Sequence, residues 1–259
     1  MILGPDGRYL FIQVPHTAST AIAAELVENY GGRPILDKHT TIMEFVNSEY
    51  AQTNGNKTEI GVTFAGVRDP FDQQITFFTK LKTGHDGLLD DKQHELGEGG
   101  HVTGRMRKKR DVIRAEDLDY AAFLKRFYKL PIDAYGCTRL TQFDDIVRHE
   151  TIQQDFERII TAAGFDHLRP IPQKNKSARD GSAADRFEEY YPPHVRQHAA
   201  NVLGPLALTW GYELDERLPA PAPWAMPAYR LVAAARNQLQ WNDGPLARGI
   251  ATLRRRINY

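Results

Sequence analysis

The feature that most constrains the fold is a buried strand, a short polar turn and a helix in direct succession, which occurs twice. Ile60–Val67 (IGVTFAGV) is continuously apolar or small, as a parallel strand buried on both faces should be. Asp69 and Pro70 follow it and suit the start of a helix. Tyr9–Val14 is rich in aromatic and β-branched residues, and the polar turn Pro15–Thr20 leads from it into helix-prone sequence. This succession predicts an α/β fold in which helices flank a central parallel sheet.

The remaining chain extends this pattern. Between the two units, Gly32–Tyr50 is typical of a short strand, a polar corner at Asp37–His39 and a helix. Asp145–His149 is a further strand candidate, and several helices follow it. We expect one domain over residues 1–218 and then, after a Pro/Ala linker, a helical C-terminal extension over residues 219–259.

The segment 83–114 departs from the pattern because it is polar and rich in glycine. Its length predicts either a lid over an acceptor site or a disordered loop. His85, His94 and His101 have neither a cysteine partner nor the spacing of a compact zinc motif, so we predict no metal site. The basic run Arg105–Arg110 is most simply a solvated loop.

Composition excludes several classes of protein. The 33 Lys and Arg residues balance 33 Asp and Glu residues, so no overall basic field indicates nucleic-acid binding. A single cysteine, Cys137, excludes an intramolecular disulfide framework. The apolar stretch Tyr9–Val14 is too short for a signal peptide, and no stretch suits a transmembrane helix, so we expect a cytoplasmic protein. The Arg254–Arg256 cluster is most simply a surface helix; contact with a membrane surface or a second subunit is the alternative.

Both turns suit an anionic ligand. A helix that begins after a buried strand presents unpaired N–H groups, and here His16 and three hydroxyl residues lie at that point. Taken alone, this segment is equally consistent with Ser19 or Thr20 simply capping the helix. Arg68 follows the other strand, and its planar fork of donors suits phosphate, although an Arg-Asp-Pro alone is more often structural. The chain contains no Gly-Lys-Ser/Thr, which argues against a nucleotide kinase.

The two motifs together resemble those of sulfotransferases that use 3′-phosphoadenosine 5′-phosphosulfate (PAPS). VPHTASTAI resembles their 5′-phosphosulfate loop, whose usual form is Val-Pro-Lys-Thr-Gly/Ala-Gly/Ser-Thr. FAGVRDPFDQQITFF resembles their 3′-phosphate segment, with Thr76 in the place of a serine eight residues after Arg68. KHTTIMEF, IVRHETIQQDFERIITAAGF, NKS, YY and WGY resemble later segments of carbohydrate-type members, and the resemblance covers about residues 9–213.

This resemblance implies a P-loop-like sulfotransferase fold and an enzyme that moves a sulfuryl group from PAPS to a hydroxyl, releasing 3′-phosphoadenosine 5′-phosphate (PAP). The acceptor is expected to be a saccharide, and an anionic one would suit the basic run in segment 83–114. His39 is implied as the catalytic base by similarity to heparan 2-O-sulfotransferase-like enzymes; a capping or solvated histidine is the alternative. The implied donor-binding residues are Pro15, His16, Thr17, Ala18, Ser19, Thr20, Ala21, Arg68, Thr76, Lys176 and Ser177.

Two residues depart from the family pattern. His16 stands where the family usually has a lysine, and a histidine is only partly cationic at neutral pH. We therefore expect His16 to act in catalysis with slower or more pH-dependent transfer, or the chain to be an impaired nucleotide- or glycan-binding protein of the same fold. Gln73 stands where the family often has an arginine, so we expect this protein to have one surface charge fewer at that position. Lys38 is interpreted as facing solvent.

Overall fold

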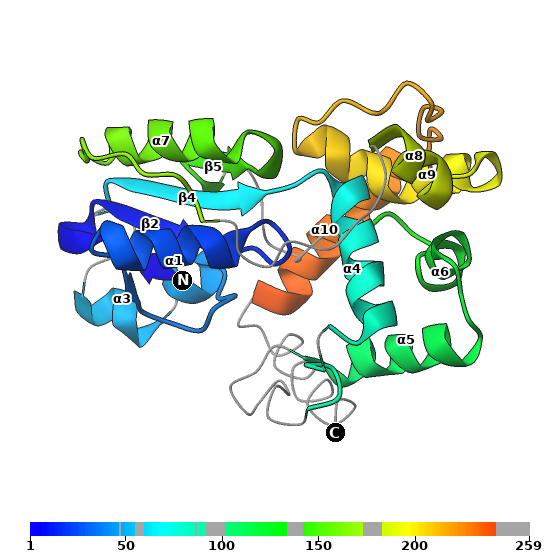
Figure 1. The fold of residues 1–259 in the computed structure, drawn as a ribbon, viewed down its shortest axis with the longest axis horizontal. Coiled ribbons are helices and arrows are strands. Elements are labelled where there is room, and N and C mark those ends of the chain that lie inside the picture. Colours follow the sequence, from blue (N-terminus) through cyan, green and yellow to red (C-terminus); the bar gives the residue numbers. More distant parts are fainter. Residues whose placement is uncertain are drawn as a thin grey trace. The chain divides into compact units, whose positions relative to one another are not determined.

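The computed structural model describes most of the chain, in seven ranges. These are residues 1–46, 48–54, 60–85, 87–91, 102–133, 142–172 and 183–241. The chain forms two compact units (Figure 1). The first comprises Met1–Asp69 and Cys137–Ala178, and the second comprises Pro70–Gly136 and Arg179–Tyr259.

A five-stranded sheet of order β3-β1-β2-β4-β5 forms the centre of the first unit. Its strands are β1 (Ile2–Leu3), β2 (Tyr9–Ile12), β3 (Arg33–Pro34), β4 (Val62–Val67) and β5 (Asp145–Arg148). β2, β4 and β5 run parallel, which confirms the predicted parallel core. β1 is antiparallel to both neighbours, so the sheet as a whole is mixed rather than parallel. Only the short 3-10 turn η1 (Pro5–Gly7) joins β1 to β2, which is too short for a parallel crossover.

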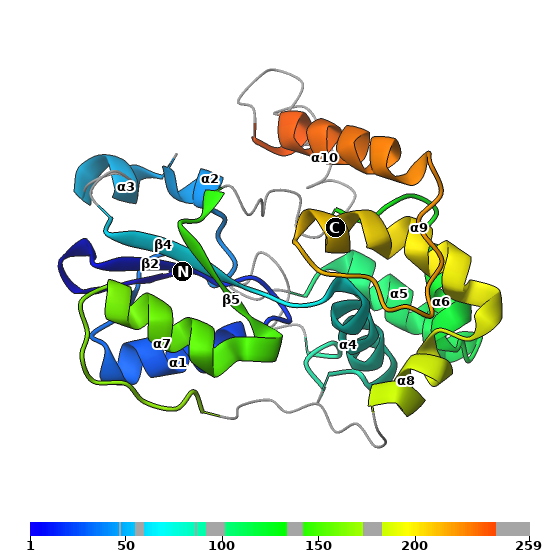
Figure 2. The same ribbon diagram turned by 90° about the horizontal axis from the view of Figure 1, so that it is seen from above.

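Helices cover both faces of this sheet, as Figure 2 shows. The helices are α1 (Ser19–Asn29), α2 (Ile42–Val46), α3 (Glu49–Asn54) and α7 (Ile152–Ala162), the last preceded by the 3-10 turn η5 (His149–Thr151). Tyr9 and Phe11 of β2 pack with α1 and α7 on one face. Leu10 and Ile12 pack with α2 and α3 on the other. The alternation of side chains along a strand thus gives β2 an apolar contact on each face.

The second unit is helical in its described residues. It contains α4 (Pro70–Thr83), α5 (Gly104–Ala115), α6 (Tyr120–Phe127), α8 (Ala183–Tyr190), α9 (Pro193–Thr209) and α10 (Ala225–Trp241). Tyr191 lies in its core, where its hydroxyl is 2.7 Å from the hydroxyl of Tyr120 and donates to the carbonyl of Phe71 at 2.9 Å. α10 packs against α9. The predicted C-terminal extension therefore contains a helix, while the predicted boundary after residue 218 stays a prediction.

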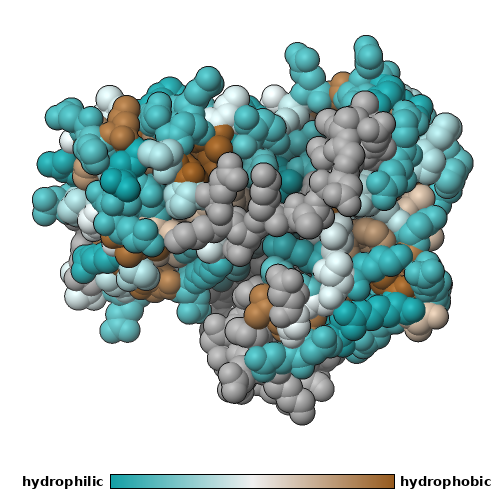
Figure 3. Space-filling view, in the orientation of Figure 1, coloured by the Kyte–Doolittle hydropathy of each residue, from teal (hydrophilic) through white to brown (hydrophobic). Residues whose placement is uncertain are grey.

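Helix α5 corrects the interpretation of Arg105–Arg110 as a solvated loop, while a lid over residues 83–114 stays a prediction. Thr103 caps it by accepting a hydrogen bond from the N–H of Met106, and Ile113 is buried. Met106 packs against the same core. Lys109 also turns inward, with its Nζ 4.4 Å from the ring centroid of Tyr128 and within 6 Å of three phenylalanine rings. Because the buried stripe contains a lysine, hydrophobic periodicity does not reveal the helix. Figure 3 shows hydrophilic side chains over α5.

Three further predictions concern residues partly outside the described ranges. Cys137, the histidines His94 and His101, and the Arg254–Arg256 cluster all lie outside them. Within those ranges, no helix has the length and hydrophobicity needed to cross a membrane.

Candidate functional site

The β2–α1 loop, residues 13–18, has an unusual backbone. His16 has φ 65° and Ala18 has φ 59°, a left-handed conformation that residues with a Cβ adopt rarely. Alternation between left-handed and other conformations directs successive backbone N–H groups toward one side, which is how proteins build anion-binding concavities. Seven of the predicted donor-binding residues fall in this loop or the first helical turn: Pro15, His16, Thr17, Ala18, Ser19, Thr20 and Ala21.

Thr17 holds the loop against the sheet. Its side chain is 1% exposed, and its hydroxyl donates to the carbonyl of Val14 at 2.7 Å. Gly66 of β4 faces it so closely that an added Cβ would lie 2.8 Å from the Thr17 hydroxyl and 2.9 Å from the Thr17 carbonyl. The Thr17 hydroxyl, which was predicted to bind the donor, therefore makes a hydrogen bond within the protein. Only a glycine at position 66 is small enough for this close contact.

The N-terminus of α1 has no side-chain cap. Ala18 is the N-cap residue, and its methyl side chain accepts no capping hydrogen bond from the helix. The first backbone bonds run from Ala21 and Ile22 to the carbonyl of Ala18, at 2.9 and 3.2 Å. The N–H groups of Ser19 and Thr20 precede these bonds and have no acceptor within the helix. The alternative in which Ser19 or Thr20 caps the helix is therefore wrong, and the helix end keeps its suitability for an anion.

Arg68 connects the second motif to the same loop. It follows the last residue of β4, Val67, and its Nη1 donates to the carbonyl of His16 at 3.4 Å. The next residue, Asp69, donates its backbone N–H to Glu150 Oε1 at 3.1 Å. The two predicted phosphate motifs thus meet at the carboxyl edge of the parallel strands β2 and β4, where open α/β sheets bind ligands.

The assignments of the remaining donor residues stay predictions. Thr76 belongs to α4 in the second unit, is 3% exposed, and donates its hydroxyl to the carbonyl of Asp72 at 3.1 Å. Gln73 on the same helix is 3% exposed, so the expectation of a lost surface charge is wrong. Lys176 and Ser177 lie outside the described residues.

The corner after β3 contributes His39. Its Nδ1 lies 2.7 Å from the carbonyl oxygen of Gln13. A carbonyl only accepts hydrogen bonds, so Nδ1 carries the proton and Nε2 is the basic nitrogen of the neutral ring. This fixed tautomer is the one that a general base needs. The geometry is compatible with the predicted role of His39, which stays a prediction.

Lys38 is exposed, as expected, and its ammonium contacts α1. Its Nζ donates to the hydroxyl of Thr20 at 3.0 Å, and partial desolvation lowers the pKa of the lysine. The amino group of Met1 ties the corner to the end of β2. It donates to Gln13 Oε1 at 2.9 Å and to the carbonyls of Asp37 and Lys38 at 3.2 and 3.3 Å. Burial lowers the pKa of this amino group to about 6, although the charge of Asp37 opposes the shift. Lys38 is thus a candidate site residue that periodicity and motif spacing did not reveal.

The segment Arg148–Glu150, which begins at the last residue of β5, has a structural role. Arg148 lies in register with Val67, at the same edge of the sheet as Arg68. Asp155 of α7 accepts from the N–H of Arg148 at 2.9 Å and from the hydroxyl of Thr151 at 2.8 Å. These contacts fix the turn after β5, as the Glu150 contact fixes the turn after β4.

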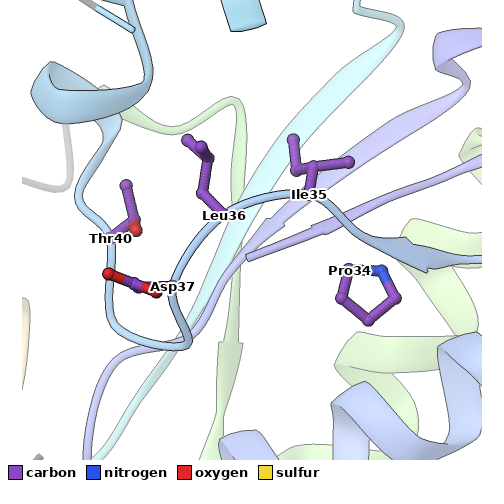
Figure 4. A pocket seen from close by; sticks show the side chains of 5 residues that line it. All are labelled: Pro34, Ile35, Leu36, Asp37 and Thr40. Atoms are coloured by element: carbon purple, nitrogen blue, oxygen red, sulfur yellow. The ribbon is translucent and has the colours of Figure 1, made fainter. Parts of the chain in front are cut away.

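Two shallow hollows adjoin the corner. One of about 360 Å³ is lined by Pro34, Ile35, Leu36, Asp37 and Thr40 (Figure 4). The other, of about 380 Å³, includes Gln13 and Lys38 among mostly apolar residues. Neither lining contains a residue of positions 14–20, so neither hollow includes the predicted 5′-phosphosulfate loop.

Within the described ranges, no three His, Cys, Asp or Glu side chains come together in a way that could hold a metal ion. Compared with known proteins, the chain matches no family model, no curated protein and no solved structure. The features that bear on function are therefore the uncapped helix, Arg68 and the corner.

Proposed function

We propose that this protein is a PAPS-dependent O-sulfotransferase that acts on a hydroxyl group, most simply one of a saccharide. The observation that carries the proposal is the uncapped N-terminus of α1 with Arg68 bound to the same loop. Either feature alone is common in proteins that bind no nucleotide. Their meeting, at the positions where the sequence resembles both phosphate motifs of these enzymes, favours a donor with phosphate groups at two places.

The 5′-phosphosulfate would bind at the helix end. The N–H groups of Ser19 and Thr20 and the positive end of the helix dipole supply hydrogen bonds and partial charge without a metal ion. Arg68 supplies a full positive charge at the adjoining strand end, and its planar donors match phosphate oxygens. These residues would hold the donor and stabilise charge on its phosphates.

The transfer itself needs little covalent chemistry from the protein. His39 Nε2 would take the proton of the acceptor hydroxyl while that oxygen forms a bond to sulfur. The bond between sulfur and the bridging phosphate oxygen breaks in line, and PAP leaves with the electron pair. A positive charge beside this phosphate would lower the barrier, because negative charge develops there as the bond breaks. The same reasoning applies to phosphoryl transfer.

Calorimetric titration of PAP into the protein tests the donor assignment. We expect saturable binding that is tighter than binding of ATP. Arg68→Ala should weaken PAP binding by about 1.5–3 kcal/mol, roughly 10- to 150-fold, because it removes charged contacts to phosphate. Thr76→Ala should cost less, about 1 kcal/mol, since it removes a neutral hydroxyl.

Arg33→Ala is the matched control. Arg33 is an exposed arginine of the same unit whose contact is a neutral one, to the hydroxyl of Tyr50 at 2.9 Å. It should leave PAP affinity unchanged. Preference for PAP over AMP, which lacks the 3′-phosphate, should shrink in Arg68→Ala alone. No saturable PAP binding by the wild-type protein, or equal affinity for ATP, refutes the proposal.

A second candidate, a nucleotide- or glycan-binding protein without turnover, is favoured by one observation, His16 in place of the family lysine. Transfer of labelled sulfate from PAPS to a panel of saccharide acceptors separates the two. Labelled product with any acceptor excludes the binding protein. Tight PAP binding without transfer to any of them favours it over the enzyme.

A further inference from the structure

We propose that Lys38 supplies the positive charge at the 5′-phosphate of the donor, in place of the lysine that the β2–α1 loop lacks. This inference rests on the proposed function and assigns a residue within the same site. The 5′-phosphate is the group that carries the sulfuryl donor and becomes the leaving group, so a cation there acts on both binding and transfer.

The position of the Lys38 ammonium carries the argument. Its Nζ lies 3.0 Å from the hydroxyl of Thr20, and Thr20 is the second residue of α1. The N–H groups at this helix end are the ones that lack an acceptor within the helix. An ammonium group has three donors, and the bond to Thr20 uses one of them. A phosphate bound at the helix end would therefore lie next to this cation.

The corner that carries Lys38 is fixed before any ligand binds. The amino group of Met1 donates to the carbonyls of Asp37 and Lys38, and His39 bonds to the carbonyl of Gln13. The backbone on both sides of the lysine is thereby tied to the sheet. A cation held in place in advance costs less to order when the ligand arrives, which favours its use in binding.

The pKa of Lys38 supports the assignment. The residue is exposed, but partial desolvation lowers its pKa, so the charged form lacks full compensation from its present surroundings. An anion at the helix end would supply that compensation. His16, by contrast, is only partly cationic at neutral pH and sits in a left-handed backbone conformation. With a lysine across the helix end, the 5′-phosphate has a cation beside it even where His16 is neutral.

The test compares two nucleotides that differ only in the 5′-phosphate, PAP and adenosine 3′-phosphate. In Lys38→Met, which keeps a stem of similar length, we expect PAP affinity to fall about 10- to 100-fold. Affinity for adenosine 3′-phosphate should stay within about twofold. Lys82→Met is the matched control, because Lys82 is an exposed lysine paired with Asp117 at 3.2 Å, and it should change neither affinity.

A second variant tests whether the charge is what matters. His16→Lys combined with Lys38→Met returns a lysine to the loop, and PAP affinity should recover by at least about tenfold relative to Lys38→Met alone. A purely structural role of Lys38 at Thr20 would give no such recovery.

The outcomes separate this inference from the proposed function. If the wild-type protein shows no saturable PAP binding, both fall. If it binds PAP and Lys38→Met binds PAP equally well, only the role of Lys38 is refuted. Equal losses for PAP and adenosine 3′-phosphate in Lys38→Met also overturn it, because the effect would then not depend on the 5′-phosphate.

Discussion

The contact between Gly66 and Thr17 makes the β2–α1 loop sensitive to one methyl group. Gly66→Ala would place a Cβ 2.8 Å from the Thr17 hydroxyl and 2.9 Å from the Thr17 carbonyl. The hydroxyl is already bonded to the carbonyl of Val14 at 2.7 Å, and the carbonyl belongs to the backbone. Neither oxygen can rotate away from the methyl group, so the loop itself must shift.

The cost follows from two opposing effects. Overpacking of a well-packed site typically costs about 1–3 kcal/mol. Alanine regains about 0.5–1 kcal/mol relative to glycine in regular structure, because it has less conformational freedom to lose. We expect Gly66→Ala to lower the free energy of unfolding by about 1–2 kcal/mol. A shifted loop that loses one N–H contact to phosphate should also bind PAP at least about tenfold more weakly.

Gly61→Ala is the matched control for this experiment. An added Cβ there would lie 2.7 Å from the carbonyl of Arg8, also a backbone oxygen, and Gly61 directly precedes β4 at the end far from the loop. Urea unfolding should show a similar loss of stability in both variants. Calorimetry should show weaker PAP binding only for Gly66→Ala. Wild-type PAP affinity in Gly66→Ala, or an equal loss in Gly61→Ala, would refute the reasoning that the loop position controls binding.

Two predictions concern catalysis and one concerns pH. His39→Ala should lower turnover roughly 10²–10⁴-fold with PAP affinity within about twofold, measured by single-turnover sulfate transfer; normal turnover excludes it as the base. His16→Lys should preserve or raise transfer above pH 7, where histidine loses its charge, and loss of transfer with intact PAP binding would make His16 a proton carrier. Burial and the nearby Arg105 lower the pKa of Lys109 from 10.5 to about 8. Between pH 8 and 10.5 the unfolded chain holds a proton that the folded chain has lost, so stability relative to Lys109→Met should rise over this window. Urea unfolding at several pH values checks this, and a constant difference contradicts it.

Much of the first unit could be predicted because its strands carry strong local signals. β4 is apolar along its length, and β2 combines aromatic and β-branched residues, so both strands and their parallel pairing follow from the pattern. The two-residue strand β1 gives no such signal, and its antiparallel pairing depends on a turn rather than on periodicity.

The site was only partly predictable for a different reason. The left-handed backbone at His16 and Ala18 falls on residues that do not signal it, since glycine and asparagine are the usual ones. The bond from His39 to Gln13 spans 26 residues of sequence, and that from Lys38 to Thr20 spans 18. Such contacts are set by how β3 and α1 pack, which a single sequence does not reveal.

The two outermost strands bear on how copies of this chain can associate. Among the described strands, β3 at one edge is two residues long and contains Pro34, which has no N–H to donate. β5 at the other edge begins and ends on charged residues, Asp145 and Arg148. Short, charged or proline-bearing edges discourage the joining of sheets from different molecules. If this protein forms an oligomer, we expect its copies to meet through helices rather than through a continuous intermolecular sheet.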